Sequence, residues 1–272
     1  MTINLQPRNF KVILWDMDGT LLNFHPAEKY AIETTMAMFK LPLCTEELRA
    51  RYAEINADHW LRMEKGEINK QQVLEGRFQQ FFREFHIGFT DYALFNKEYQ
   101  KNLGAKVFFY EDAYEIVANL KGKIKQYAIT NGNNVAQQLK LKNSGLGLLF
   151  DGVFISDQIG YEKPSEQFFA YALTHLEYDV LLRDNTSLAL LAALGIGQNS
   201  HEKIARSLLE NSLGTITQEE ILVIGDSLTS DMLGGYQAGL KCCWFNVENG
   251  QEPEIPHIDY NISRLREIEK FI

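Results

Sequence analysis

The sequence has few of the features that mark secreted, membrane-bound or metal-sulfur proteins. Its three cysteines, Cys44, Cys242 and Cys243, form no C-x-x-C pair, and its six histidines include no H-x-x-x-H pair. We therefore expect neither a disulfide framework nor a zinc site. No apolar run approaches the length of a membrane span, and the first residues lack the basic and then apolar pattern of a signal peptide. The sequence thus predicts a cytoplasmic protein with no membrane partner.

An excess of positive charge is also missing. The formal net charge is −9 and the isoelectric point is about 5.3. Such a balance disfavours binding to a nucleic-acid polymer or to an anionic membrane, because both attract basic surfaces. A small phosphorylated metabolite remains possible, since a bound metal can reverse the local sign of a site. With 272 residues, the chain can form one large domain or a main domain with a smaller companion.

A short apolar run near the start of the chain ends in two carboxylates. The run from Val12 to Trp15 predicts a buried parallel strand, and it delivers Asp16 and Asp18 to the edge where open α/β sheets bind ligands. Two carboxylates one residue apart repel each other, and a hard cation such as Mg²⁺ would offset their charge. Gly19 and Thr20 predict a sharp turn whose N–H groups and hydroxyl could donate to a phosphoryl group.

The next segment, residues 24–106, has apolar residues at helical spacing and predicts about four helices. We interpret it as an all-helical domain inserted after the first strand. Within it, Trp60 and Arg62 are candidates for substrate contact, because an aromatic ring can stack on a nucleobase and a guanidinium can pair with a phosphate. The alternative is that both belong to an ordinary amphipathic helix, with the aromatic ring packed inside and the charge in solvent.

Strands and helices alternate in the remainder of the chain. The predicted strands are 125–130, 150–156, 221–225 and 241–246, and the predicted helices include 111–120, 135–142 and 165–176. This order indicates an α/β fold with a doubly wound parallel sheet, a Rossmann-like core formed by residues 1–23 and 107–272. Residues 177–214 form an additional segment with helical spacing, for which packing on the core is favoured over an oligomer contact or a flap.

Polar residues follow four of the predicted strands. Thr130 and Asn131 end the second strand, Lys163 follows the third, and Asp226 and Asp231 follow the fourth. Because the carboxyl ends of parallel strands meet at one edge, these side chains should converge with the first two aspartates. A carboxylate can form an aspartyl-phosphate, and a second carboxylate can act as general acid and then as base. Hydroxyl, amide and ammonium groups can hold the phosphoryl oxygens, and acidic groups can hold a metal.

In order, the chain contains DMDGT at 16–20, TNG at 130–132, KP at 163–164 and GDSLTSD at 225–231. This series resembles the four motifs of the haloacid dehalogenase superfamily of hydrolases, and the helical insert lies where that superfamily places its first type of cap. The resemblance implies that Asp16 is the nucleophile and Asp18 the general acid/base. The implied phosphoryl-binding groups are Thr130, Asn131, Gly132 and Lys163.

The resemblance also implies a magnesium site. Asp16, the main-chain carbonyl of Asp18, and Asp226 would hold Mg²⁺, with Asp231 behind them ordering bound water or Lys163. Members of the superfamily that cleave carbon–halogen bonds lack an aspartate at the place of Asp18. Its presence here therefore points to phosphatase or phosphotransferase chemistry.

A narrower likeness is to the pyrimidine 5′-nucleotidases of this superfamily. It is carried by the cap segment 60–68 and by residues 18–24, 161–164, 225–231, 234–235 and 238–239. It implies Mg²⁺-dependent hydrolysis of a nucleoside 5′-monophosphate. We expect the protein to be a monomer or homodimer. One alternative is a sugar-phosphate or phosphoglycolate phosphatase, or a phosphomutase. An alternative of another class is a non-catalytic module that binds a phosphorylated metabolite.

Overall fold

The computed structural model describes residues 9–177, 179–181, 213–247 and 258–272. The described chain forms two compact units. The first takes in the described parts of Met1–Leu21, Phe109–Asn131 and Leu146–Ile272, and the second consists of Leu22–Phe108 and Gly132–Gly145. The helical unit therefore contains residues 132–145 in addition to the predicted insert.

Six strands of the described residues form one parallel sheet in the first unit, in the order β3-β2-β1-β6-β7-β8. They are β1 (Val12–Asp16), β2 (Lys125–Thr130), β3 (Gly152–Ile155), β6 (Ile221–Gly225), β7 (Lys241–Phe245) and β8 (Tyr260–Ile262). Every residue of β1 and β6 is buried, as expected for central strands covered on both faces. The predicted doubly wound fold is confirmed.

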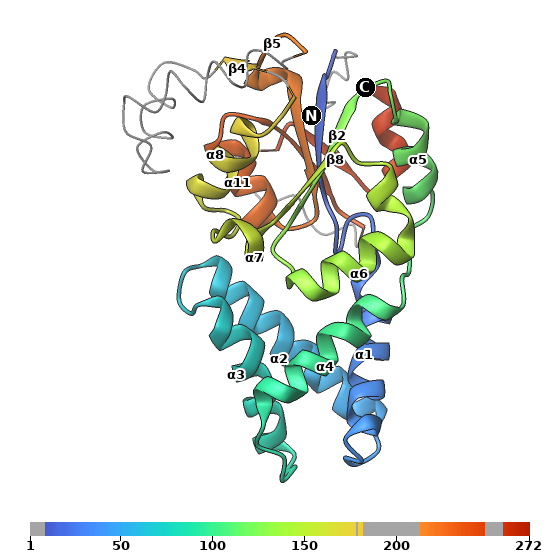
Figure 1. The fold of residues 1–272 in the computed structure, drawn as a ribbon, viewed down its shortest axis with the longest axis vertical. Coiled ribbons are helices and arrows are strands. Elements are labelled where there is room, and N and C mark those ends of the chain that lie inside the picture. Colours follow the sequence, from blue (N-terminus) through green and yellow to red (C-terminus); the bar gives the residue numbers. More distant parts are fainter. Residues whose placement is uncertain (1–8, 178, 182–212, 248–257) are drawn as a thin grey trace. The chain divides into compact units, whose positions relative to one another are not determined.

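Helices cover both faces of this sheet. On one face lie α8 (Glu166–Thr174) and α11 (Leu233–Gln237), and on the other α5 (Ala113–Leu120) with the 3₁₀-helix η4 (Leu265–Lys270) (Figure 1). Phe168 and Phe169 of α8 join Leu14 and Val223 in the core on their side. The C-terminal segment is a short strand, β8, followed by the 3₁₀-helix η4.

A second, two-stranded parallel sheet pairs β4 (Asp179–Leu181) with β5 (Thr215–Thr217). These strands lie at the two ends of the predicted extra segment 177–214, for which the sequence indicated helices only. Each strand has three residues, too few for a period of two to be visible in the sequence. The predicted helical material at 188–194 and 204–209 lies outside the described residues.

The second unit is helical, as the spacing of apolar residues indicated. It contains α1 (Phe24–Met38), α2 (Glu46–Glu64), α3 (Lys70–Glu84), α4 (Tyr92–Ala105) and α6 (Asn134–Ser144). Asn69 and Gln72 form a capping box at the start of α3. The core of the unit is largely aromatic, with Phe78 in contact with Tyr52, Phe95 and Tyr99. None of the helices in the described ranges is long and apolar enough to cross a bilayer.

Three charged residues, Glu28, Arg77 and Lys140, are buried inside the helical unit, and the first two are linked to each other. Arg77, 1% exposed, donates to Asn56 Oδ1 at 2.7 Å, and Asn56 donates to Glu28 Oε1 at 2.6 Å. Burial raises the pKa of Glu28 to about 7, although Asn56 and Arg77 both oppose the rise. The carboxyl group and the guanidinium are therefore linked through an amide rather than by a direct ion pair.

Candidate active site

The nucleophile candidate stands at the end of the central strand. Asp16 is the last residue of β1, and its side chain is buried. The strand is paired with β2, where Asp16 lies opposite Ile129, and with β6, where Trp15 lies opposite Ile224. This register brings the C-terminal ends of β2 and β6 to either side of Asp16, as the parallel topology predicts.

Lys163 occupies the centre of the site. Its Nζ donates to Asp16 Oδ1 at 2.7 Å, to Asp231 Oδ1 at 2.6 Å and to the carbonyl of Ile129 at 3.2 Å. An ammonium has three donors, so all three are used. Burial alone would lower the pKa of Lys163, but the charges of Asp16 and Asp231 outweigh burial and raise it above its usual value. The ammonium stays charged and holds the two aspartates together.

The side chain of Asn131 fixes the main chain of Lys163. Asn131 Nδ2 donates to the Lys163 carbonyl at 2.8 Å, and the Lys163 N–H donates to Asn131 Oδ1 at 2.7 Å. The sequence assigned Asn131 a role only toward a phosphoryl group. The structure adds a side-chain role, because this pair of hydrogen bonds joins the end of β2 to the loop that carries the lysine.

Three carboxylates gather around this lysine. Oxygens of Asp16, Asp226 and Asp231 lie within 4.8 Å of one another, and Asp16 Oδ2 is buried and accepts no hydrogen bond from the described residues. When all groups are ionised, the cluster has two negative charges in excess of the ammonium. An all-oxygen donor set with this charge suits a divalent hard cation such as Mg²⁺. The residues present therefore fit the predicted metal.

The electrostatics of the aspartates agree with that fit. Burial raises the pKa of Asp16, and the charges of Asp231 and Asp226 add to the rise, while Lys163 opposes it. Burial also raises the pKa of Asp226 to about 7, helped by the charge of Asp231. In both cases the folded protein disfavours the ionised carboxyl group, and a cation bound nearby would reverse this.

Two glycines make room for the acidic ligands. Gly19 has a φ of 100°, and a Cβ there would lie 2.3 Å from Asp226 Oδ2. A Cβ on Gly225 would lie 2.3 Å from Asp231 Oδ2. Any side chain at either position would displace a carboxylate, so both motifs need glycine here.

Thr20 does not act as the sequence suggested. Its hydroxyl donates to Asp226 Oδ1 at 3.0 Å, and the residue is fully buried. The sequence had predicted that this hydroxyl donates to a phosphoryl group. The motif pattern places the residue correctly but cannot show which acceptor its hydroxyl selects. Thr20 therefore orients an acidic residue that is 206 positions further along the chain.

The remaining predicted residues are placed as follows. Asp18 is half-buried two residues after Asp16, and Thr130 ends β2 as a buried residue. The carbonyl of Gly132 accepts a weak hydrogen bond from Lys70 Nζ at 3.5 Å, a neighbour that sequence reasoning missed. Lys70 is the first residue of α3, and the spacing of residues in the sequence does not indicate this contact.

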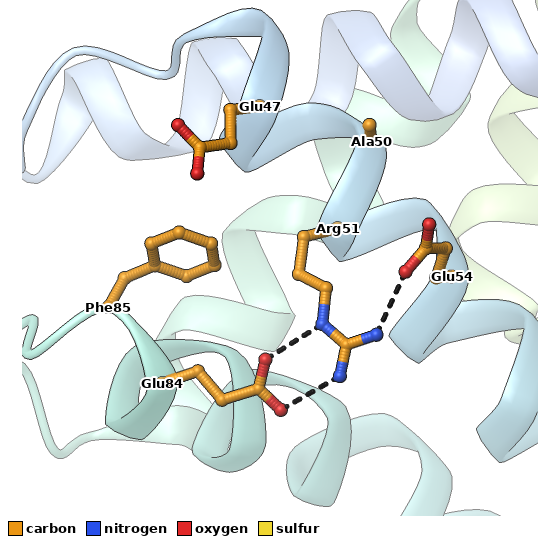
Figure 2. A pocket seen from close by; sticks show the side chains of 6 residues that line it. All are labelled: Glu47, Ala50, Arg51, Glu54, Glu84 and Phe85. Atoms are coloured by element: carbon orange, nitrogen blue, oxygen red, sulfur yellow. Dashed lines mark hydrogen bonds and ion pairs between the residues drawn. The ribbon is translucent and has the colours of Figure 1, made fainter.

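The two cap candidates lie on α2 of the helical unit. Trp60 is half-buried, and Arg62 forms ion pairs with Asp58 at 3.9 Å and Glu67 at 3.4 Å. Their role in substrate contact stays a prediction. A shallow pocket elsewhere on this unit, between α2 and α3, is lined by Glu47, Ala50, Arg51, Glu54, Glu84 and Phe85 (Figure 2). Its arginine is engaged by Glu84 and Glu54, so this pocket is a poor site for a phosphate.

The parallel sheet and the acidic cluster at its carboxyl edge define a Rossmann-like enzyme fold with a site centred on an aspartate. The comparisons with known proteins specify the family. The chain belongs to the haloacid dehalogenase-like hydrolases, whose family model matches residues 10–239. The prediction from the four motifs is thereby confirmed, and the protein is a hydrolase.

Relatives match nearly the whole chain. The HAD-hydrolase YfnB of Bacillus subtilis is 28% identical over 263 residues, covering 96% of this chain and 94% of YfnB. A crystal structure of YfnB bound to magnesium has a TM-score of 0.75, covering 96% of this chain and 97% of that one. The pyrimidine 5′-nucleotidase PynA of Streptococcus pneumoniae is 28% identical, with 94% and 93% covered. The pyrimidine 5′-nucleotidase YjjG of Escherichia coli is 24% identical, with 96% of each chain covered.

Proposed function

We propose that this protein is a Mg²⁺-dependent phosphatase that hydrolyses a small phosphate monoester through an aspartyl-phosphate on Asp16. The observation that carries the proposal is the hydrogen bonding of the two oxygens of the Asp16 carboxylate. Lys163 holds Oδ1 at 2.7 Å, while the buried Oδ2 accepts no hydrogen bond within the described chain. An oriented carboxylate with one oxygen available is suited to nucleophilic attack.

In the first step, an Asp16 oxygen forms a bond to phosphorus and the bond from phosphorus to the ester oxygen breaks. Asp18 is the general acid that donates its proton to the leaving oxygen, a contribution of about 10²–10⁴ in rate. The Thr130 hydroxyl and the N–H groups at Asn131 and Gly132 bind the phosphoryl oxygens. The Lys163 ammonium, whose three N–H groups are engaged beside Asp16, stabilises the charge of these oxygens electrostatically.

In the second step, Asp18 is a carboxylate and accepts a proton from water. The water oxygen attacks phosphorus, the bond from phosphorus to Asp16 breaks, and inorganic phosphate leaves. Asp16 is then a free carboxylate and Asp18 is protonated for the next cycle. The same aspartate thus acts as acid and as base.

Asp16, the main-chain carbonyl of Asp18, and Asp226 would hold Mg²⁺, with Asp231 beside them fixed by Lys163. When bound, the cation would compensate the charge of the phosphoryl oxygens and of the acidic cluster. Lys163 complements it, because its ammonium keeps Asp16 and Asp231 close together.

For the substrate, we propose a nucleoside 5′-monophosphate, with a pyrimidine base preferred. The proposal is supported by the two relatives named as pyrimidine 5′-nucleotidases, which match this chain over at least 93% of their own length. Trp60 and Arg62 of the helical unit are the proposed contacts for the base or sugar. We place the enzyme in the cytoplasm as a monomer or homodimer.

Phosphate release from nucleoside monophosphates and sugar phosphates, with Mg²⁺ or with a chelator, tests this function. We expect metal-dependent release that is highest for pyrimidine nucleotides and is lost in Asp16→Asn. Asp151→Asn is the matched control, because Asp151 pairs with Lys125 at 2.8 Å at the other end of β2 and should keep full activity. Preference for a sugar phosphate would overturn the substrate, and binding without turnover would overturn the enzymatic proposal.

A further inference from the structure

A tryptophan outside the four motifs contacts the loop that carries the metal ligands. Trp244 lies on β7, and its Nε1 donates to the main-chain carbonyl of Asp226 at 2.9 Å. The register of β6 and β7 ends with Gly225 opposite Trp244. Asp226 is therefore the first residue beyond the paired strands. Its carbonyl accepts a hydrogen bond from the indole side chain of β7.

Asp226 is consequently held at two points. Trp244 fixes its main-chain carbonyl, and Thr20 donates to its carboxylate. The chain then turns, and the N–H of Ser227 donates to Asp231 Oδ2 at 3.2 Å before the π-helix η3 (Leu228–Met232) begins. Without the indole, the carbonyl of Asp226 loses this hydrogen bond, while the N–H of the same peptide stays bonded to Asp231. The peptide, and the carboxylate that precedes it, are then held less tightly.

We propose that Trp244 is a positioning residue that presets Asp226 as a metal ligand. This inference rests on the magnesium site of the proposed function. Groups that orient metal ligands typically contribute 10–100-fold in metal affinity. Since a single hydrogen bond is involved, we expect the loss of the indole N–H to weaken Mg²⁺ binding about tenfold.

Trp244 is also part of the core beside α8, so its substitution costs some stability whatever its role. Trp15→Phe is a matched control for that cost. Trp15 is fully buried on β1, and its Nε1 donates to Gln126 Oε1 at 3.1 Å. The control also removes an indole hydrogen bond from the same sheet, one that is more deeply buried than that of Trp244 and does not involve Asp226.

The test is the affinity for Mg²⁺, measured by calorimetry and by the Mg²⁺-dependent rise in melting temperature. We expect Trp244→Phe to bind about tenfold more weakly, Trp15→Phe to bind within twofold of the wild type, and the kcat of Trp244→Phe to recover at high Mg²⁺. A benzothienyl analogue at position 244, which keeps the ring shape without an N–H, should bind as weakly as Trp244→Phe and serves if that variant does not fold.

Unchanged Mg²⁺ affinity in a folded variant at position 244 would overturn the inference, even if its melting temperature falls. Equal weakening in Trp15→Phe would also overturn it, because the effect would then be general to the sheet. If the wild type itself binds no Mg²⁺, the proposed metal site fails and this inference fails with it. The first two results leave the proposed function intact, so the two failures are distinguishable.

Discussion

Replacing Lys163 with methionine should destabilise the protein more than any surface ion pair could. The lysine side chain is 2% exposed, and its partners Asp16 and Asp231 are 8% and 1% exposed. Removing one member of a buried charge cluster typically costs about 3–5 kcal/mol, because the remaining charges lose their compensation. We therefore expect Lys163→Met to lose about 3–5 kcal/mol of unfolding free energy at pH 8 in the presence of a chelator.

Lys125→Met is the matched control. Lys125 also bridges two carboxylates, Asp151 at 2.8 Å and Glu177 at 2.7 Å, but all three side chains are at least a quarter exposed. Exposed ion pairs are worth about 0–1 kcal/mol each, so the loss of both pairs should cost this variant about 2 kcal/mol or less. Both substitutions remove the same charge and put the same side chain in its place, and they differ mainly in burial.

The loss in Lys163→Met should also depend on pH. Burial already raises the pKa of Asp16, and without the lysine the pKa rises further. A carboxyl group with a raised folded-state pKa stabilises the fold at low pH and loses that contribution as the pH rises, by about 1.4 kcal/mol per unit. The loss at pH 5.5 should therefore be smaller than the loss at pH 8.

Urea unfolding followed by circular dichroism measures both effects. If Lys163→Met loses no more free energy than Lys125→Met at pH 8, the account of a buried, mutually compensating cluster is wrong. The same conclusion would follow if its loss were equal at pH 5.5 and pH 8. Added Mg²⁺ should recover part of the loss, since the cation would compensate the same carboxylates.

Three further outcomes are expected. Asn131→Ala should lower kcat about 10–100-fold with little change in Mg²⁺ affinity, because the loop that carries Lys163 loses both of its hydrogen bonds to Asn131. An unchanged kcat in steady-state kinetics would show that the amide is dispensable. Glu28→Gln should raise the free energy of unfolding by about 1–3 kcal/mol at pH 8 and leave it unchanged at pH 4.5. Burial raises the pKa of Glu28 to about 7, so the wild type loses stability as the pH rises from 4.5 to 8 and this carboxyl group ionises. Urea titrations that show a destabilised variant at pH 8 would contradict this. A chelator should abolish phosphate release and added Mg²⁺ should restore it, and release that persists in excess chelator would exclude the metal.

The order of the polar residues along the chain was enough to predict where the site forms. Asp16, Lys163, Asp226 and Asp231 converge because parallel strands bring their carboxyl ends to one edge, a rule that needs no side-chain detail. The helical insert could also be predicted from the sequence, since its apolar residues recur at helical spacing over about eighty residues. Motif order and periodicity are backbone-level properties, and both can be read from a single sequence.

The hydrogen bonds that complete the site could not be predicted. The hydroxyl of Thr20 and the indole of Trp244 both donate hydrogen bonds to Asp226, from which they are separated by 206 and 18 residues in the sequence. Such partners depend on strand register and rotamer, neither of which a motif contains. The pairing of β4 with β5 could not be predicted either, because strands of three residues show no period. The burial of Arg77 was not predicted because a charged residue in a helix is usually exposed to solvent.

The most direct test of the account is chemical trapping of the intermediate on Asp16. The protein with Mg²⁺ is mixed with its best substrate, quenched in acid and reduced with borohydride, which converts an aspartyl-phosphate to homoserine. The account predicts homoserine at position 16 in the wild type. Phosphate release with aspartate intact at position 16 in every quenched sample would show that water attacks the substrate directly and would contradict the central claim.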